Sequence, residues 1–516
     1  MNHGIACGAV VALLVGYCVV RQRSSISHIR GPPSPSWIFG NMLQFRLPSS
    51  YGDYEFKWFK IYGLVYRLKG CFGQNHLVVS DLLACQHILK SPHFAISPTL
   101  DNQLRLAVGD GTMIRLRGKA HQRLRNGLNP GFTAAAARSF QPIFDNVAQA
   151  ITQELELSGT APIDIVPPLS IATFTAIAGA ALGYSLDDLG EEYVVATDQT
   201  TVASSTQTAG HILANALGAW LPTWLLRAAL HLPTKTFKAA RKASHLAQSI
   251  GAQVVKEKHD LVQQGLNTDG DIFGILLDQV HSNTERIPLT GEEIVDQTQT
   301  IMTAGQETTT KTIAFGLWEL AKNPELQESL RAEIHSSPGE TGQNGGYDQM
   351  PLLNAFIKET LRFYPAEAFT ERMVVEDTVI PLSESITTST GEQISEISVG
   401  KGQVVIVGIA SYHRLESHWG ADADKFRPSR WFEDTILNAD AVGPYANLLA
   451  FLTGPHTCLG WRFAILEMQA VICELVGKFA FALPENDSVR VCMANTLQPV
   501  LSSGERGVLL RVSRLL

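Results

Sequence analysis

Cys458 is the residue whose setting most clearly suggests chemistry. It lies in the run Phe451-Leu452-Thr453-Gly454-Pro455-His456-Thr457-Cys458-Leu459-Gly460, which leads into an amphipathic stretch from Trp461. A thiolate at this point would lie at a helix N-terminus, where backbone N–H groups and the helix dipole stabilise negative charge. Gly454 and Gly460 would let the backbone turn tightly around the sulfur and approach a flat ligand. This pattern favours an axial ligand of haem iron, where a thiolate promotes O–O cleavage; the alternative is a buried structural cysteine.

The other six cysteines are Cys7, Cys18, Cys71, Cys85, Cys473 and Cys492. No two of the seven have C-x-x-C spacing, and the total is odd. A disulfide framework or a zinc site is therefore not expected, and a reducing compartment fits the composition.

A second motif is Ala304-Gly305-Gln306-Glu307-Thr308-Thr309, within a stretch of helical spacing. Small side chains at Ala304 and Gly305 would leave a groove where a flat cofactor and a diatomic ligand approach the backbone. Glu307 and Thr308 place an acid beside an alcohol, a pair that can relay protons through water. The alternative is a threonine-rich helix face that bonds to its own carbonyl groups.

The elements that must position these motifs are mostly helical. Thr290 and Glu293 form a predicted capping box, from which one helix is expected to run to Lys322, about 50 Å at 1.5 Å per residue. Asn323-Pro324 should stop it. Apolar runs at 77–79 and 403–407 predict short strands. The expected fold class is therefore mostly α with small β-sheets.

Two further groups of charged residues have a structural interpretation. Glu359 and Arg362 share one face of a helix that should end before Pro365, and Arg430 offers a second guanidinium. One carboxylate held by two arginines would form a buried lock. The alternative is an ion pair between Glu359 and Arg362 at the surface, which ordinarily contributes little stability. His121 and Arg125 share another helix face and are suited to grip carboxylates; the alternative is a solvated basic face.

The chain has 516 residues, a net charge of −8 and no charge runs, which gives no reason to expect nucleic-acid binding. Residues 1–20 are mostly apolar and uncharged, and Arg21 and Arg23 follow. We expect a membrane anchor over residues 1–20 with the rest of the chain in the cytoplasm, rather than a cleaved signal peptide. A basic, proline-rich hinge over 21–45 and a single domain over 46–516 are predicted to follow.

In order and spacing, these motifs resemble those of microsomal cytochrome P-450, a family of haem-thiolate monooxygenases. The resemblance covers the whole chain. It implies the cytochrome P-450 fold, with a long central helix over haem b and Cys458 as the iron ligand. It assigns Glu307 and Thr308 to oxygen activation and Glu359, Arg362 and Arg430 to the lock. The residues that it places around haem are Phe451, Gly454, Gly460, Ala304, Gly305, His121, Arg125, Arg372 and His456. The chain departs from the family pattern at His456, His121 and Ser429.

The resemblance also implies O2 as co-substrate and electrons from NADPH through a membrane-bound flavoprotein reductase, with cytochrome b5 as a further donor, at the endoplasmic reticulum membrane. A basic docking patch is predicted at Arg115, Arg117, Lys119 and Arg123, with a solvated helix face as the alternative. Pocket residues are expected near 96–113, before Thr308, at 366–369 and at 495–500. Their mostly small or apolar character suits a lipophilic substrate. The segment Trp220–Leu226 is expected either to dip into the membrane or to form a core loop.

Hydroxylation of a terpenoid, fatty or polyketide intermediate of specialised metabolism is the leading functional hypothesis. The first alternative is haem-thiolate isomerisation or dehydration without net oxygen input. The second is a non-enzymatic, membrane-tethered haem-binding protein.

Overall fold

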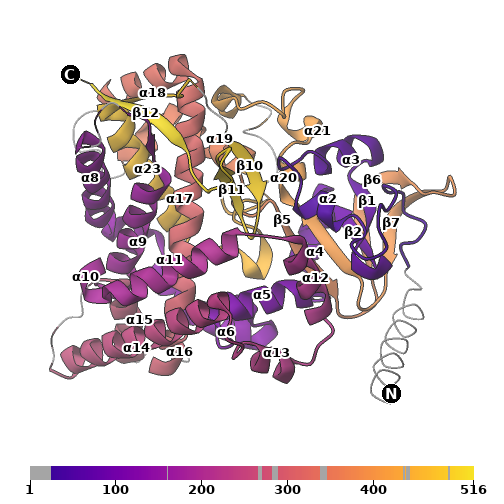
Figure 1. Ribbon diagram of the computed structural model, residues 1–516, viewed down its shortest axis with the longest axis horizontal. Coiled ribbons are helices and arrows are strands. Elements are labelled where there is room, and N and C mark those ends of the chain that lie inside the picture. Colours follow the sequence, from indigo (N-terminus) through magenta and orange to yellow (C-terminus); the bar gives the residue numbers. More distant parts are fainter. Residues whose placement is uncertain are drawn as a thin grey trace.

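The computed structural model describes residues 25–515 apart from 158, 160, 265, 267–269, 282–288, 337–345, 434–435, 437–441 and 486–488. The predicted anchor over residues 1–20 lies outside the described residues. Helices make up most of the molecule, and the largest sheet lies in a lobe on the right of Figure 1. The fold class predicted from the sequence is confirmed.

The helices, labelled as in Figure 1, are α2 (Met42–Arg46), α3 (Glu55–Tyr62), α4 (Leu82–Lys90), α5 (Pro98–Val108), α6 (Gly118–Leu128), α7 (Ala134–Ser139), α8 (Gln141–Leu157), α9 (Val166–Leu182), α10 (Leu186–Leu189), α11 (Glu191–Ser205), α12 (Ala209–Gly218), α13 (Thr223–Ala229), α14 (Lys235–Gln263), α15 (Ile272–His281), α16 (Gly291–Val295), α17 (Thr298–Lys322), α18 (Pro324–Ser336), α19 (Pro351–Phe363), α20 (Ile409–Tyr412), α21 (Glu416–Trp419) and α23 (Trp461–Lys478). None of the helices in the described part of the chain combines the length and apolarity that a bilayer span requires.

The largest sheet has five strands in the order β1-β2-β8-β5-β3, namely Val65–Lys69, Asn75–Val79, Val404–Gly408, Phe369–Val374 and Phe94–Ile96. The two strands predicted at 77–79 and 403–407 are its parallel pair, with Leu77 opposite Val405. The smaller sheets are β6-β7 (Thr378–Thr387, Gln393–Val399), β10-β11 (Arg490–Met493, Leu497–Val500) and β4-β12-β9 (Ile163–Asp164, Leu509–Arg514, Phe479–Ala482).

The segment predicted as a hinge belongs to the globular body from residue 25 onward. Ile26 and Ile29 are buried, as is Phe45 on α2. The carbonyl of Arg30 accepts a hydrogen bond from the Arg67 amide on β1 (2.8 Å). The described part of residues 21–45 is therefore packed against the five-stranded sheet, and the domain begins earlier than residue 46.

The predicted helix over 290–322 is two helices. The capping box is present, because the Glu293 amide donates to Thr290 Oγ1 (3.2 Å) and the Thr290 amide to Glu293 Oε2 (2.9 Å). A turn at 296–297 then separates α16 from α17. The buried amide of Gln297 accounts for the break, because it accepts a bond from the Met113 amide (2.9 Å) and donates to the carbonyl of Gly111 (3.3 Å). The 25 residues of α17 span about 37 Å, whereas the single helix predicted over 290–322 would span about 50 Å.

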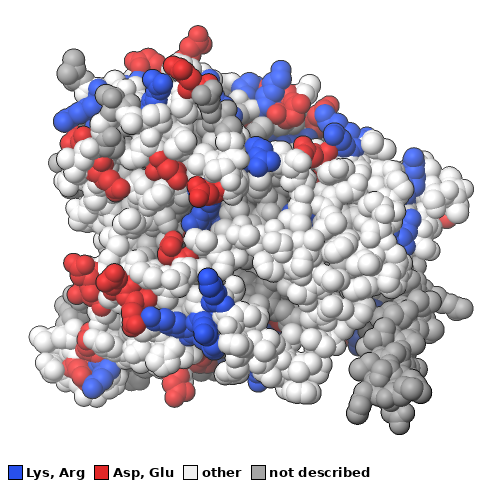
Figure 2. Space-filling model, viewed as in Figure 1, with Lys and Arg blue, Asp and Glu red and all other residues white. Residues whose placement is uncertain are grey.

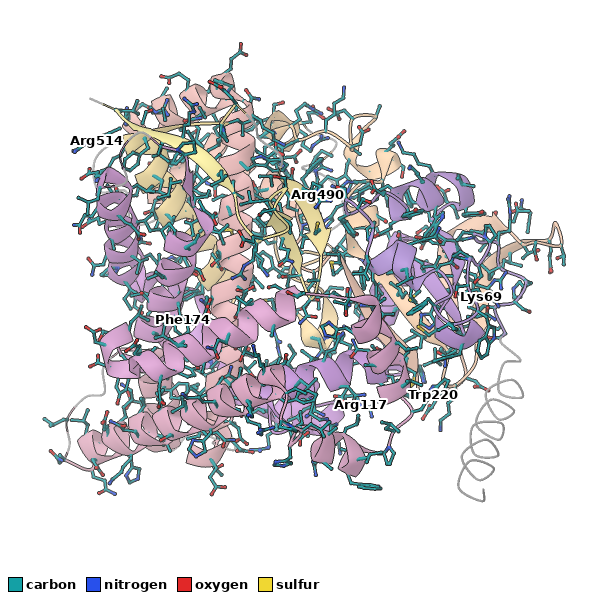
Figure 3. All side chains as sticks on the ribbon, viewed as in Figure 1. Lys69, Arg117, Phe174, Trp220, Arg490 and Arg514 are labelled. Carbon is teal, nitrogen blue, oxygen red and sulfur yellow. The ribbon has the colours of Figure 1, made fainter. Side chains whose placement is uncertain are left out.

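The surface is unevenly charged. Figure 2 shows acidic and basic side chains interspersed over the left and upper parts of one face, whereas the surface over β10-β11 and α12 is mostly uncharged. Trp220, which follows α12, lies beside this region at the lower right of Figure 3, and Arg117 lies at the base of the molecule. Exposed aromatic side chains, Trp220 and Trp224 among them, form part of this uncharged surface.

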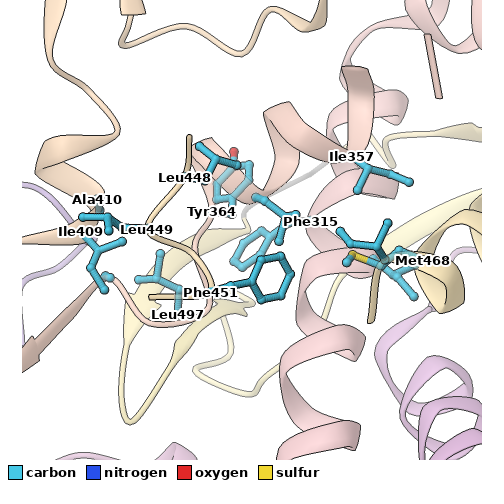
Figure 4. Packing of buried hydrophobic residues seen from close by; sticks show 14 of the residues in the cluster. Phe315, Ile357, Tyr364, Ile409, Ala410, Leu448, Leu449, Phe451, Met468 and Leu497 are labelled. Carbon is cyan, nitrogen blue, oxygen red and sulfur yellow. The ribbon is translucent and has the colours of Figure 1, made fainter. Parts of the chain in front are cut away.

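The core is centred on α17, which packs against α9, α19 and α23. Nearly every residue of α17 from Thr309 to Ala321 is buried, as expected of a helix enclosed on all sides. Figure 4 shows Phe315 of α17 beside Tyr364, and their rings stack with centroids 4.3 Å apart. This packing fixes α17 relative to α23, the helix that follows Cys458.

Candidate active site

The residues before Cys458 form a tight loop between α4 and α23. The Cys458 amide donates to the carbonyl of Phe451 (2.9 Å), and the Thr457 amide donates to that of Gly454 (3.1 Å). Gly454 has φ +75°, and a Cβ there would lie 2.6 Å from the carbonyl oxygen of Leu89 on α4. Glycine is therefore favoured here both by the left-handed turn, as predicted, and by the close approach to α4.

Gly460 differs from Gly454. Its φ is −89° as the N-cap of α23, and the nearest atom to a built Cβ is Phe132 Cε1 at 3.8 Å. Nothing among the described residues requires glycine at this position, so any requirement would come from a ligand, as the sequence pattern suggests.

Cys458 combines an accessible side chain with a desolvated thiol. Its side chain is exposed, yet burial raises the pKa of the thiol to about 11, against lowering contributions from the Gly460 amide and Arg125. Protein therefore surrounds a thiol that remains accessible. The helix N-terminus alone does not stabilise a thiolate here, contrary to the expectation from sequence. A metal cation would have to displace the proton on binding.

Ala304 and Thr308 lie on one face of α17. Ala304 is exposed although it is in the middle of the central helix, and Thr308 is half-buried. The Thr308 hydroxyl donates to the carbonyl of Ala304 (2.9 Å), the self-bonding arrangement that was the alternative from sequence. The hydroxyl is therefore held at an accessible position of the helix.

Gly305 does not face that groove. A Cβ built on Gly305 would lie 2.6 Å from Cγ1 of Ile177 on α9, so glycine here allows α9 and α17 to pack closely. The prediction that Gly305 makes room for a cofactor is wrong, because its missing side chain points toward another helix.

Glu307 forms two ion pairs. Its carboxylate lies 2.5 Å from Lys311 Nζ and 3.0 Å from Arg506 Nη1. Burial tends to raise the pKa of Glu307, but Lys311 and Arg506 together outweigh it and hold the pKa below its ordinary value. Lys311 also donates to Thr496 Oγ1 (2.7 Å). Glu307 is therefore ionised and can accept protons.

Four predicted carboxylate-binding residues are brought together beside Cys458. His121 and Arg125 lie on α6, Arg372 on β5 and His456 in the cysteine loop. The rings of His121 and His456 have centroids 4.2 Å apart. Arg125 Nη1 donates to the carbonyl of Thr457 (2.6 Å), which ties α6 to the same loop. We refer to His121, Arg125, Arg372 and His456 as the cationic cluster.

The arginines of the cationic cluster have no direct carboxylate partner among the described residues. Burial, followed by His121, Arg372 and Arg125, lowers the pKa of His456 to about 3, so this ring is neutral at physiological pH. His121 Nε2 is buried without a hydrogen-bond partner. Within the described residues, neither Arg125 nor Arg372 has a carboxylate within 4 Å. The cluster would therefore gain from an anionic ligand that supplies carboxylates.

The predicted lock is fully assembled. Glu359, Arg362 and Arg430 are each inaccessible to solvent. Arg362 donates two bonds to the Glu359 carboxylate (2.8 and 2.9 Å), and Arg430 Nε donates one (3.0 Å). The Arg427 amide (2.7 Å) and the Trp431 indole (3.0 Å) complete five bonds to Glu359. The surface alternative is wrong, because tertiary packing buries all three side chains.

The predicted docking patch is largely neutralised. Arg115 is buried and pairs with Asp101 (3.0 Å) and Asp110 (2.6 Å), and Arg123 pairs with Glu293. Of the four predicted residues, only Arg117 and Lys119 are exposed. A strongly basic surface is not present at α6.

Sequence reasoning missed three residues of this region. Lys311 stands four positions after Glu307, a spacing that could have indicated the pair. Arg506 is 199 residues from Glu307 and could not have been found from local spacing. Glu367 lies in a segment that had been interpreted as mostly small or apolar, and its side chain is exposed.

The geometry fits a haem, because the accessible Cys458 adjoins a cationic cluster whose arginines have no carboxylate within 4 Å among the described residues. Comparison with known proteins agrees. The sequence pattern of the family Cytochrome P-450 matches residues 30–507. A relative from Postia placenta, named cytochrome P-450 monooxygenase 91, is 30% identical over 99% of this chain and 98% of its own. Another from Ampulloclitocybe clavipes, named cytochrome P-450 monooxygenase claO, is 30% identical over 90% of this chain and 88% of its own. The chain therefore belongs to the cytochrome P-450 family and is a monooxygenase of that family.

Proposed function

We propose that this monooxygenase inserts one oxygen atom of O2 into a hydrophobic small molecule, with electrons that a separate flavoprotein reductase draws from NADPH. The observation that carries the proposal is the accessible thiol of Cys458 beside the cationic cluster, together with the exposed Ala304 on the central helix α17. One thiol, a set of carboxylate-binding groups and a hydroxyl on the facing helix are the parts that haem-based oxygenation needs.

Haem b would be held by Cys458 through its iron and by the cationic cluster through its carboxylates, and when bound it supplies oxygen activation. The protein's own contribution is to move protons and exclude water. The Thr308 hydroxyl is bonded only to a carbonyl of its own helix, so it is free to turn and donate to a ligand in the groove. Ionised Glu307 accepts protons behind it, because Lys311 and Arg506 stabilise its charged form.

Two alternatives remain distinguishable by experiment. An isomerase or dehydratase of the same cofactor would turn over without O2, whereas the proposed function requires it. A non-enzymatic haem-binding protein would show no reductase-dependent O2 consumption with any substrate. The accessible Thr308 hydroxyl and the ionised Glu307 favour oxygenation, because O–O cleavage needs delivered protons.

We propose a terpenoid, fatty or polyketide intermediate of specialised metabolism as the substrate class. The apolar character of the predicted pocket segments supports a lipophilic molecule; for example, Phe369 and Leu497 carry no charge and are nearly buried.

We propose further that the protein is anchored at the endoplasmic reticulum membrane through residues 1–20. An aromatic surface supports this placement. Trp37 contacts Phe72 (centroids 5.7 Å apart), and Phe72 contacts Trp220 (5.5 Å). Trp220, Leu221 and Trp224 are exposed, the last by 69% of its surface, which argues against a core loop at 220–226. Such aromatics favour the interface of a bilayer.

The reductase, and cytochrome b5 as a further donor, remain proposals that rest on the family. The exposed Arg117 and Lys119 offer only a weak basic surface for an acidic flavin domain. Charge neutralisation at these two positions should lower the association rate modestly, with a stronger effect at low ionic strength.

The reduced, CO-bound absorption spectrum of purified protein tests the proposed function, beside the variant Cys458→His. We expect a strongly red-shifted thiolate-type band in the parent and its loss in the variant. A matched variant, Cys473→Ser, changes a buried cysteine of α23 and should keep the band. A well-folded parent with an imidazole-type spectrum, or without haem, would refute the assignment of Cys458 and the oxygenation that depends on it.

A further inference from the structure

A pocket away from Cys458 lies among α3, the end of α19, α21 and the strand pair β10-β11, in the upper part of Figure 1. Its volume is about 590 Å³, within the range of about 300–1,000 Å³ that is typical of small-molecule sites. Cys458, Ala304, Thr308 and the cationic cluster are not among the described residues that line it. The pocket is therefore not the site where haem is expected to bind.

Tyr364 lies between this pocket and α17. It lines the pocket and also stacks on Phe315 of α17, with ring centroids 4.3 Å apart (Figure 4). The Tyr364 hydroxyl donates to Glu319, which is also on α17. Phe315 comes seven residues after Thr308, about 10 Å along a helix. The pocket therefore adjoins the central helix about two turns away from the Thr308 hydroxyl.

The walls of the pocket are largely aromatic. Five aromatic side chains line it, namely Tyr51, Phe56, Phe59, Phe363 and Tyr364. The guanidinium carbon of Arg414, which also lines the pocket, lies 4.4 Å from the centroid of the Phe56 ring and 4.5 Å from that of Phe363. Cation–π contacts with two rings hold this guanidinium in place within mainly apolar surroundings.

Most of the hydrogen-bonding capacity of Arg414 is unused. Nη1 donates to the carbonyl of Ala410 (3.2 Å), and Nη2 donates to that of Phe363 (2.9 Å). A guanidinium has five N–H groups, so three have no acceptor within the described residues. The side chain is only half-buried. A ligand in the pocket could therefore reach the free N–H groups.

The charge of Arg414 also lacks a close counter-ion in the described part of the chain. Glu55 acts on Arg414 only from beyond 4 Å. The Glu55 carboxylate instead accepts bonds from the hydroxyls of Tyr51 and Ser411 (both 2.5 Å). Burial, followed by Arg362, lowers the pKa of Arg414 to about 10, so this side chain remains a cation at neutral pH. A desolvated cation without a counter-ion is costly, and an anion in the pocket would relieve that cost.

The other charged side chains of the pocket are less able to select a ligand. Lys60, Glu416 and Asp424 are exposed and carry charges of both signs. Water and salt screen exposed charges strongly, whereas a half-buried charge among aromatic rings is screened less. Arg414 is therefore the charge that a ligand inside the pocket would meet most directly.

We propose that this pocket is a second small-molecule site, which binds an apolar molecule ending in a carboxylate. The carboxylate would accept the free N–H groups of Arg414, and the apolar body would pack on the aromatic walls. Arginine is suited to this role because its planar fork matches the two oxygens of a carboxylate. Occupancy of this site would be independent of the haem groove.

Equilibrium dialysis of the haem-loaded, full-length protein tests the proposal. The probes are 2-naphthoate and naphthalene-2-carboxamide, which have nearly the same shape but differ in charge. Arg414→Gln removes the cation, and Leu64→Trp fills the pocket without altering Arg414. The control Arg511→Gln makes the same change at an exposed arginine of β12 that does not line the pocket. Each titration is repeated with saturating 4-phenylimidazole, which coordinates the iron and fills the haem groove.

We expect the parent and Arg511→Gln to bind one 2-naphthoate per chain, about tenfold or more tightly than the carboxamide, because a charged pair of hydrogen bonds is lost with the amide. Arg414→Gln should reduce that preference to about twofold or less. Leu64→Trp should weaken binding of both probes by about tenfold or more. The dissociation constant of 2-naphthoate should be the same with and without 4-phenylimidazole.

Equal binding of the two probes by the parent, or an unchanged preference in Arg414→Gln, would overturn the proposal. Loss of 2-naphthoate binding when 4-phenylimidazole is present would also overturn it, because the probe would then occupy the haem groove. If Arg414→Gln fails to fold, as judged by its CO-bound spectrum, Leu64→Trp decides the question. Weaker 2-naphthoate binding by well-folded Leu64→Trp supports the site, and unchanged binding refutes it.

Discussion

The buried carboxylate of Glu359 allows a quantitative test of how the cysteine-bearing half of the fold is held together. It is inaccessible to solvent, as are Arg362 and Arg430, and it accepts five hydrogen bonds. In Glu359→Ala, two buried guanidinium groups would keep only their bonds to carbonyl oxygens and to Asp422. Removing one partner of a buried ion pair costs about 3–5 kcal/mol.

This loss of unfolding free energy can be converted into a decrease in melting temperature. Unfolding entropy near 2.1 cal/mol/K per residue, over 516 residues, amounts to about 1.1 kcal/mol/K. Glu359→Ala should therefore lower Tm by about 3–5 °C. Glu359→Gln, which keeps the volume and an acceptor oxygen but not the charge, should give a smaller decrease of the same sign.

The assay is thermal denaturation at one fixed scan rate, because a protein of this size unfolds irreversibly and its apparent Tm depends on rate. Glu433→Ala is the matched control. Glu433 pairs with Arg427 at 2.5 Å, but both side chains are substantially exposed, and an exposed pair contributes at most about 1 kcal/mol. Tm values for Glu359→Ala and Glu433→Ala within about 1 °C of each other would refute the argument that burial makes the lock strong.

Three further outcomes are expected. Thr308→Ala should lower product formed per NADPH by about tenfold or more, because the hydroxyl on α17 that delivers protons is lost; fully coupled turnover would count against its role. Arg506→Gln should destabilise the protein most above pH 4.5. Arg506 helps to lower the pKa of Glu307 in the folded state, and the stability that this contributes is lost as the pH falls through the lowered pKa. The loss of stability, measured from pH 4 to 7, should therefore depend on pH, and a pH-independent difference would contradict this. Gly305→Ala should lower the free energy of unfolding by about 1–3 kcal/mol, because the added methyl group overpacks against Ile177, and adding Ile177→Ala should recover part of that loss. Additive losses of the two variants in denaturant unfolding would show that the two side chains do not meet.

The features that the sequence predicted correctly depend on short-range rules. The capping box at Thr290 and the helix stops before Pro324 and Pro365 follow from backbone hydrogen bonding within a few residues. The strands at 77–79 and 403–407 were visible as β-branched runs, although their parallel pairing was not. The cysteine loop carried enough local pattern to predict a haem ligand at Cys458, and that assignment stays a prediction.

Tertiary structure decided the features that depend on distant neighbours. Ile177 determines why residue 305 is glycine, and the remote Arg506, together with Lys311, holds Glu307 ionised. Asp101 and Asp110 neutralise Arg115, which the sequence alone presents as a free cation. The chemical type and spacing of Cys458, Glu359 and Thr308 are set by the sequence itself. Their accessibility, charge state and partners arise only when helices remote in the chain pack together, because burial and electrostatic interaction depend on distance in space rather than along the chain.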